Sequence, residues 1–304
     1  MTLNLYYPIF IMKFYSRPSL IIVCLVLTSL FIFASKALLT HKGTSQYFPD
    51  AVYFSDEPAP LNTIDVKERF DRELLINANL HSSTLLILKR ANRYFPVIEP
   101  ILKQNAVPDD FKYLCVIESA LTNATSPAGA RGFWQFMPET AKEKGMEINE
   151  SVDERYHLAK ATQAACDYLL AAKQKFGSWT LAAASYNGGM NGIAKSLEAQ
   201  KVTNYYDLLL TEETQRYVFR ILALKEIMQN PKSYGFKLEK NELYEPIPTK
   251  IIEIDSTVSD LAEFSKLQGI NYKILKIHNP WLRDKKLLNT SNKKYLIEIP
   301  TAGY

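Results

Sequence analysis

The chain has 304 residues, enough for an N-terminal segment, one substantial domain and one small one, because domains most often run to about 100–150 residues. Its 47% hydrophobic and 22% charged residues are typical of a globular protein that buries a core, which excludes a disordered or collagen-like chain. The net charge of +4 is weak and neither sign gathers into long runs, so the composition does not favour nucleic acid as a partner.

The N-terminal segment sets the expected compartment. Residues 19–34 carry no charge, and two basic residues, Lys13 and Arg17, precede them, which is typical of a membrane-targeting segment with its basic end inside. Five further residues bring the run to the roughly 20 that a bilayer span needs. Lys36 stands where a signal-peptidase site would need its second small residue, which favours an uncleaved anchor over a cleaved signal peptide. We therefore expect a signal anchor over residues 1–40, with the rest facing the periplasm in the cell envelope.

The next segment reads as a linker. Residues 41–61 contain Gly43, Pro49, Pro58 and Pro60 and show no sustained period. We expect it to give the following domain reach away from the membrane.

Helical patterns then continue to Pro231, which stops the last of them. They predict one all-α domain over residues 62–231. The expected helices are a stretch with Val66, Phe70 and Leu74 at four-residue spacing, then 83–93, a proline-started 96–105, 109–119, 153–176, 179–186 and 213–230.

A different pattern begins at about residue 250. It predicts a strand at 251–254, helices at 257–268 and 271–278, and a closing strand at 295–299. Residues 250–301 are therefore expected to form a small βααβ unit, and the whole protein is expected to be mainly α.

Cysteine and histidine usage argues against metal chemistry. Cys115 and Cys166 each lie among apolar residues at helical spacing, which favours buried thiols, although an extracytoplasmic location would permit a disulfide between them. The four histidines show no metal-ligand spacing. The sequence thus indicates neither a zinc hydrolase nor any cofactor.

Glu118 is the first candidate for chemistry. Phe111, Leu114, Cys115 and Glu118 follow one another at i, i+3, i+4 and i+7, after a proline suited to a first helical turn. A carboxyl group on this buried stripe loses hydration, which raises its pKa and keeps it protonated, as a general acid for a glycosidic oxygen requires. The alternative is that Glu118 ends the helix and turns outward, as most glutamates do.

Two later segments have the composition of a ligand cleft. Residues 126–141 combine two glycines, an aromatic run and an amide, and are too apolar for a plain surface loop. Residues 182–189 bring Tyr186 and Asn187 to a helix end, where glycines let a ligand approach the backbone. Aromatic and amide surfaces of this kind suit sugars.

Together these segments resemble the lytic transglycosylase branch of the goose-type lysozyme superfamily. The resemblance rests on four motifs in the family's order, at 118–119, 132–138, 184–187 and 213–218. It departs from the family pattern at Ser185, where alanine is common, and at the glycine pair that follows Asn187. The resemblance implies a lysozyme-like all-α domain with Glu118 as catalytic acid. It implies substrate-binding roles for Ser119, Gln135, Phe136, Met137, Tyr186, Asn187 and Tyr217.

The resemblance also implies a reaction with one carboxylic acid. Most glycosidases use two carboxylates, but Asp153, Glu139 and Glu143 lie outside the matched motifs and read as helix-start charges or solvated faces. In the family, the C6 hydroxyl of the substrate attacks C1 and leaves a 1,6-anhydro-muramic end. The substrate implied is the β-1,4 linkage from MurNAc to GlcNAc in peptidoglycan.

Residues 251–300 partly resemble a LysM carbohydrate-binding module. The match includes the helix start at 256–262 and the Asn-Pro turn at 278–282, whereas the usual Pro-Gly-Gln before the last strand is missing. This favours the fold over retained glycan affinity. Because the cleft motifs end at Tyr217, we expect this unit to take no part in cleavage.

Two other interpretations stay open on the sequence. One is a hydrolytic muramidase on the same fold, and the other is a non-catalytic protein that binds peptidoglycan. Glu118 together with all accompanying motifs argues against the second. The expected partners are glycan strands and, through the N-terminal segment, the membrane; no protein partner is indicated.

Overall fold

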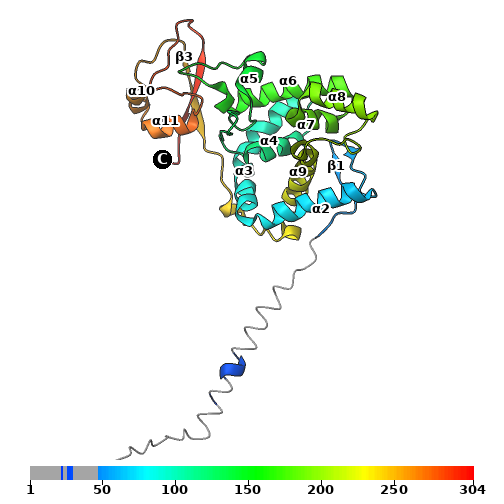
Figure 1. The fold of residues 1–304 in the computed structure, drawn as a ribbon. Helices are drawn as coiled ribbons and strands as arrows, with labels where there is room; N and C mark the ends of the chain where they lie inside the picture. The colour runs from blue at the N-terminus through cyan, green and yellow to red at the C-terminus, as the bar shows by residue number, and fades with distance from the viewer. Residues whose placement is uncertain (1–21, 23–25, 30–46) are drawn as a thin grey trace, which may run out of the picture. The chain divides into compact units, whose positions relative to one another are not determined.

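The computed structural model describes residue 22, residues 26–29 and residues 47–304 (Figure 1). The anchor expected over residues 1–40 therefore lies almost wholly outside the described residues. In the part of the chain that is described, no helix is both long and apolar enough to cross a membrane. Residues Tyr47–Tyr304 form a compact unit of their own.

That unit consists of helices and two small antiparallel sheets, coloured in chain order in Figure 1. The elements are β1 Tyr53–Phe54, β2 Glu57–Pro58, α2 Ile64–Asn79, α3 His81–Gln104, α4 Phe111–Ser119, α5 Pro138–Glu143, η1 Glu154–Tyr156, α6 Leu158–Phe176, α7 Trp179–Gly188, α8 Met190–Gln200, α9 Glu212–Gln229, η2 Pro231–Tyr234, η3 Lys240–Glu242, β3 Thr249–Ile254, α10 Leu261–Leu267, α11 Tyr272–His278 and β4 Tyr295–Pro300. The predicted fold class, mainly α with a closing βααβ unit, is confirmed.

Helix α9 is the centre of the helical domain, since α2, α4 and α7 all pack against it. Consecutive residues on different sides of α9 are buried, including Val218, Phe219 and Leu222, each with no exposed surface. Because these apolar residues occupy more than one face of the helix, several other elements have to cover it, while charged residues such as Arg216 and Lys225 stay partly exposed. The sequence of α9 therefore dictates the arrangement of its neighbours.

The prediction of separate helices at 83–93 and 96–105 is wrong, because α3 runs without interruption through Pro96 and Pro100. A proline inside a helix removes a hydrogen bond and costs about 3 kcal/mol. The buried stripe of α3 keeps its helical spacing on both sides of the prolines, at Ile87, Ile98 and Leu102. Burial of this stripe on one side of a single helix offsets the lost hydrogen bonds.

Residues 47–61, within the expected linker, pack on the helical domain. Phe54 has no exposed surface and lies edge-to-face on Phe111 at 5.0 Å. The carboxylate of Glu57 accepts hydrogen bonds from the hydroxyl of Ser178 (2.7 Å) and from the backbone N–H groups of Trp179 (2.6 Å) and Thr180 (2.9 Å). A hairpin about 120 residues upstream in the sequence thus caps the N-terminus of α7.

The C-terminal unit has the predicted order of strand, two helices and strand. Strands β3 and β4 pair antiparallel, with Thr249 opposite Pro300 and Ile254 opposite Tyr295. Its first helix begins at Leu261 and not at residue 257, because the Asp260 side chain caps it by accepting from two backbone N–H groups. A second apolar core lies here, and it includes Val152 from the helical domain.

Glu57→Gln should lower the free energy of unfolding at neutral pH by about 1–2 kcal/mol, because a charged acceptor for three donors becomes a neutral one. Burial alone would raise the pKa of Glu57, but these hydrogen bonds hold it below its usual 4.5. A carboxyl group whose pKa is lower in the folded than in the unfolded state stabilises the folded protein at pH values above the unfolded-state pKa. That contribution is lost as the pH falls through the folded-state pKa. Urea unfolding at neutral and acid pH should therefore show a difference that shrinks in acid.

The neighbouring Asp56 supplies the control, since Asp56→Asn makes the same change in charge at an exposed position. Equal losses in the two variants would contradict a capping role for Glu57.

Candidate active site

Glu118 lies in the last turn of α4, which is otherwise deeply buried. Phe111, Leu114 and Cys115 have no exposed surface, as the stripe predicts, whereas the Glu118 side chain is half-buried. The helix stops just after it because Ala120 and Leu121 adopt positive φ angles of 51° and 56°. Such angles are unfavourable for residues other than glycine, and they are typical of functional sites where surrounding contacts enforce them.

Helix α9 places two side chains against Glu118. The Tyr217 hydroxyl donates a hydrogen bond to Oε1 of Glu118. Arg220, less than one turn further along α9, donates from Nη2 to the carbonyl of Ile117 at 3.1 Å, which brings its charge close to the carboxyl group. The family-implied neighbour Tyr217 thus lies beside the acid, together with a cation.

Burial raises the pKa of Glu118 to about 7, although the hydrogen bond from Tyr217 and the charge of Arg220 act in the opposite direction. The nearby charge of Glu213 adds to the increase. A carboxyl group with this pKa is largely protonated up to neutral pH, and it can both donate and accept a proton. This is the protonation behaviour expected from the sequence stripe.

A cleft of about 510 Å³ is lined by Gln135, Phe136, Met137, Tyr186 and Asn187, among others. Glu118 is not part of this lining, but it lies close enough to Tyr186 for its charge to act on that residue. The amide nitrogen of Gln135 donates to the backbone carbonyls of residues 124 (3.1 Å) and 132 (2.7 Å). The amide donors are therefore occupied, and the side-chain carbonyl oxygen is the group that Gln135 offers to a ligand. Its backbone has a φ of 49°, a third strained position in this region.

Tyr186 is the lining residue with the most aromatic contacts to its neighbours. Its hydroxyl donates to the carbonyl of Trp134 at 2.9 Å, and its ring lies edge-to-face on Phe136 and Tyr168. Burial, followed by the charge of Glu118, raises the pKa of Tyr186 well above its usual value. Tyr186 therefore stays neutral and presents a fixed aromatic surface that suits a sugar ring.

Asn187 is held by groups from the start of α9. Its Nδ2 donates to Glu213 at 3.2 Å, and its Oδ1 accepts from the Thr214 hydroxyl at 2.7 Å. The amide is thus oriented before any ligand arrives. Glu213 in turn lines a small charged depression with Glu212, Arg216 and Arg220.

Of the substrate-binding residues predicted from the sequence, Gln135, Phe136, Met137, Tyr186 and Asn187 line one cleft. Tyr217 contacts Glu118 instead, and both lie beside that lining.

Ser119 is set apart from the cleft residues. It is only 9% exposed, and its hydroxyl donates to the carbonyl of Cys115 and accepts from the N–H of Thr122, both at 3.4 Å. These contacts fasten the end of α4.

The carboxylates proposed as a second catalytic group are placed differently from one another. Asp153 is buried, and although burial alone would raise its pKa, hydrogen bonds from Arg155 and Arg131 hold that pKa below its usual range. Glu139 is exposed at the start of α5. Glu143 is also exposed but lines the rim of the cleft.

Sequence reasoning missed Arg220, Glu213 and Thr214 as members of this site. All three share α9 with Tyr217, at offsets of three or four residues that place them on its side of the helix. Glu213 and Thr214 lie inside the matched motif at 213–218 and Arg220 lies just beyond it, so following the helical period around Tyr217 would have found all three. Cys115 and Cys166 are both buried free thiols, as predicted.

Two family models match the chain. Residues 95–209 match the model described as "Transglycosylase SLT domain", and residues 250–303 match "Soluble lytic transglycosylase C-terminal LysM-like domain". Two parts of the chain thus match these two models in the predicted order, which confirms the resemblance predicted from its motifs.

More specific likenesses come from individual proteins. Two curated relatives from different Escherichia coli strains, both named "Membrane-bound lytic murein transglycosylase D", are 29% identical over 238 residues, covering 76% of this chain and 51% of each relative. The chain therefore spans about half the length of these curated relatives. A solved structure of an inactive mutant of lytic transglycosylase Slt from Pseudomonas aeruginosa covers 50% of this chain and 26% of that one, at 19% identity and a TM-score of 0.36.

Glu118→Gln should stabilise the protein in alkaline solution but not in acid. The usual pKa of 4.5 applies to the unfolded chain and about 7 to the folded one. A carboxyl group whose pKa is higher in the folded state contributes its full stability to the folded protein at pH values below the unfolded-state pKa. That contribution is lost as the pH rises through the folded-state pKa. Glutamine has no charge to bury, so thermal melts at about pH 8.5 should show a gain on the order of 1–2 kcal/mol, discounted for partial exposure.

At about pH 4.5 the two proteins should melt together, because the carboxyl group is then protonated in the folded state. The exposed replacement Glu139→Gln serves as the control. A Glu118→Gln variant that is less stable than the parent at both pH values would contradict a raised pKa.

Proposed function

We propose that the protein is a lytic transglycosylase that cleaves the β-1,4 linkage between MurNAc and GlcNAc in peptidoglycan and leaves 1,6-anhydro-MurNAc ends. The observation that carries the proposal is a carboxyl group with a pKa of about 7 that is hydrogen-bonded by Tyr217 and lies close to Tyr186, a residue of an aromatic and amide-lined cleft. The names of the curated relatives, which describe lytic murein transglycosylases, agree with it.

The proposed reaction is the one that the family resemblance implies, with Glu118 in both proton-transfer roles. Its protonated carboxyl donates a proton to the glycosidic oxygen as the bond to C1 of MurNAc breaks, so the GlcNAc chain leaves as an alcohol. The resulting carboxylate is stabilised by the Tyr217 hydroxyl and by the charge of Arg220. It then takes the proton from the C6 hydroxyl of MurNAc as that oxygen bonds to C1, which restores the acid and closes the anhydro ring.

The cleft residues have binding roles in this scheme. Tyr186 and Phe136 supply apolar surface for a sugar face, while Gln135 and Asn187 present amides that are already oriented by protein contacts. Amide groups fixed in this way lower the entropic cost of binding a polar ligand.

A hydrolytic muramidase is the second candidate, because Glu143 on the cleft rim is a carboxylate able to activate water. A non-catalytic peptidoglycan-binding protein is the third. The raised pKa of Glu118 speaks against the third, since a binding surface does not need a carboxyl group poised between its two protonation states.

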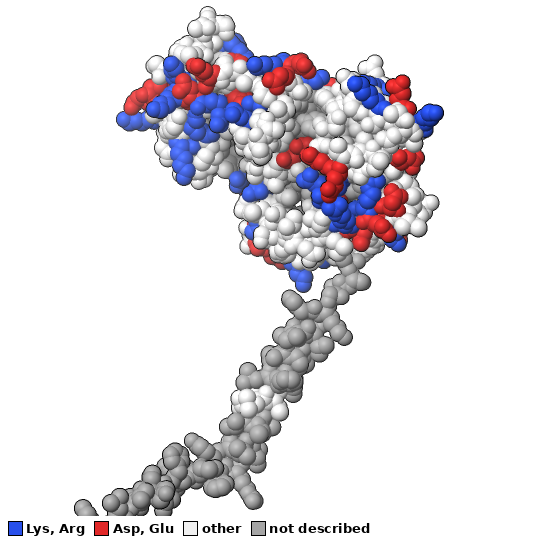
Figure 2. All heavy atoms as spheres, viewed as in Figure 1, with Lys and Arg blue, Asp and Glu red and all other residues white. Residues whose placement is uncertain are grey.

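Glycan strands of the wall are the proposed partner, and no nucleic acid is proposed. On the face drawn in Figure 2, basic side chains lie intermixed with acidic ones and form no continuous track for phosphates. We also propose that the enzyme faces the periplasm and is anchored by the apolar run that begins at residue 19.

Glu118→Gln should reduce turnover by about 10⁴-fold or more, because general acid–base groups contribute roughly 10²–10⁴ and one residue here acts in both directions. In the parent protein, kcat/KM should fall tenfold per pH unit above about 7, where Glu118 loses its proton. Mass spectrometry of digested sacculi measures both rate and product.

The matched control is Glu143→Gln, which removes a carboxylate from the cleft rim and should leave the products unchanged. Products with reducing muramic ends, lost in Glu143→Gln, would replace the lytic assignment with a muramidase. Undiminished cleavage by a folded Glu118→Gln variant would exclude Glu118 from the chemistry.

The full-length chain should remain with the membrane fraction, and a chain beginning at Tyr47 should be soluble, because residues 19–34 form a long uncharged apolar run. Fractionation of expressing cells with and without alkaline carbonate measures this. Recovery of full-length protein as a soluble chain cut after about residue 35 would contradict the anchor.

A further inference from the structure

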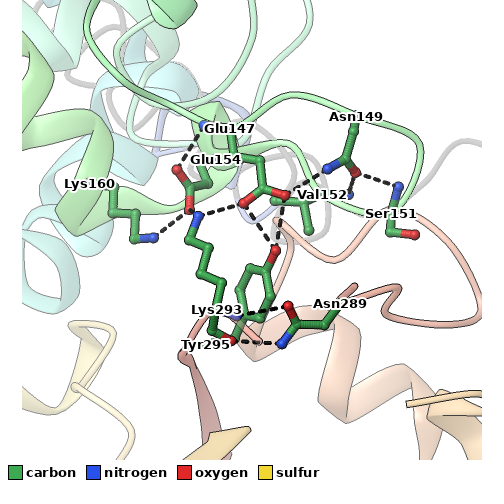
Figure 3. Close-up of polar contacts among 9 residues, drawn as sticks. All are labelled: Glu147, Asn149, Ser151, Val152, Glu154, Lys160, Asn289, Lys293 and Tyr295. Carbon is green, nitrogen blue, oxygen red and sulfur yellow. Dashed lines mark hydrogen bonds and ion pairs between the residues drawn. The ribbon is translucent and has the colours of Figure 1, made fainter. Parts of the chain in front are cut away.

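The C-terminal unit is docked on residues 147–157, the segment that precedes α6 (Figure 3). Its main chain pairs with that segment: the N–H of Asp153 donates to the carbonyl of Trp281 at 2.9 Å, and the N–H of Arg283 donates to the carbonyl of Ser151 at 2.8 Å. These bonds lie between backbones far apart in sequence, as in a sheet. The unit is therefore joined to the helical domain by more than its connecting chain.

Charged groups reinforce this docking, as Figure 3 shows. Lys293 contacts Oε2 of Glu147 at 2.5 Å and Oε1 of Glu154 at 3.2 Å. The Tyr295 hydroxyl donates to the carboxylate of Glu147, whose two oxygens lie 2.9 and 3.0 Å away. Glu154 is only 3% exposed, so its charge needs a partner, and the C-terminal unit supplies one of them.

Apolar contacts complete the interface. Val152 and Tyr156 belong to the same buried core as Trp281 and Leu282 of the C-terminal unit. The Trp281 ring stacks against His157 with centroids 5.9 Å apart. The Asn-Pro turn that gave the LysM-like match is thus partly used for docking.

The docked segment also supports the wall of the cleft. Arg155 is 3% exposed, and its Nη1 donates to the carbonyls of Gly129 at 3.1 Å and Phe136 at 3.2 Å. Asp153 holds the same guanidinium through bonds of 2.9 and 2.8 Å. A Cβ at Gly132 would lie 1.9 Å from the carbonyl oxygen of Arg155, so the two backbones are in direct contact.

We propose that the C-terminal unit is a positioning element for the cleft: it holds residues 147–157, which through Asp153 and Arg155 hold the main chain of the wall that carries Gln135 and Met137. This inference rests on the proposed function, since it concerns binding in the same cleft. It revises the expectation from sequence that the unit takes no part in cleavage. Its role is exerted through protein contacts and requires no glycan affinity of its own.

Two replacements loosen the docking without disturbing either core. Lys293→Met keeps the aliphatic stem and removes the charge, and Tyr295→Phe keeps the ring that stacks on Trp281 and removes the hydroxyl. Lys294→Met is the matched control, because Lys294 is 70% exposed and pairs at 2.8 Å with Glu253 inside the C-terminal unit. Lys293→Arg, which retains the charge, is the conservative rescue.

All variants are made in the full-length chain and assayed on uncrosslinked peptidoglycan strands well below their melting temperatures. In Lys293→Met with Tyr295→Phe, amide exchange at residues 147–157 should accelerate and the KM should rise about three- to thirtyfold, as expected for loss of coupled neighbouring contacts. The alkaline limb of the pH profile should stay at about 7, because the contacts of Glu118 come from α9. Lys294→Met should match the parent, and Lys293→Arg should recover most of the KM.

An unchanged KM overturns the proposal. If amide exchange nevertheless accelerates, docking has no bearing on the cleft. If amide exchange is also unchanged, these contacts do not hold the segment. A lower melting temperature with unchanged KM would likewise assign the interface a purely structural role. Failure of the proposed function is distinguishable, since the parent chain would then release no anhydro ends at all.

Discussion

The hydrogen bond between Tyr217 and Glu118 joins the two helices on which the candidate site depends. Helix α9 buries most of its apolar residues in the core, which sets its position, and Tyr217 projects from it at a fixed point. Helix α4 packs on α9 and ends one residue beyond Glu118. The acid is therefore located by packing of apolar side chains, and its pKa is set by the burial that this packing enforces.

The price of this arrangement is seen in the backbone next to the acid. Ala120, Leu121 and Gln135 all have positive φ angles without being glycine, and such residues cost roughly 1 kcal/mol or more each. They persist because other groups hold them: Arg90 donates to the carbonyl of Ala120 at 3.2 Å, and Gln135 bonds twice to neighbouring carbonyls. The strained positions here lie in the turn out of α4 and in the lining of the cleft.

Much of the fold could be predicted from the local periodicity of the sequence. The stripe from Phe111 to Glu118 predicted the buried setting of this carboxyl group, and the change of pattern at residue 250 predicted the βααβ unit, because both are properties of neighbouring residues. The unbroken α3 was not predictable in this way, since only tertiary burial of Ile98 and Leu102 outweighs the prolines. The same holds for Glu57 as a cap of α7 and for Arg155 under the cleft wall, whose partners are fixed by the fold and not by spacing.

The C-terminal unit shows that residues of a partial motif can be required by the fold itself. Asn279 has no exposed surface; its Nδ2 donates to the carbonyls of Leu275 and Glu298, and its Oδ1 accepts from the N–H of Glu298. These bonds tie the turn after α11 to β4, so this asparagine is required by the fold whether or not a glycan binds. Trp281, two residues on, is 4% exposed and packs toward the helical domain. In the Asn-Pro turn that contributes to the LysM-like resemblance, Asn279 thus builds the unit and Trp281 docks it, so protein contacts alone account for both residues.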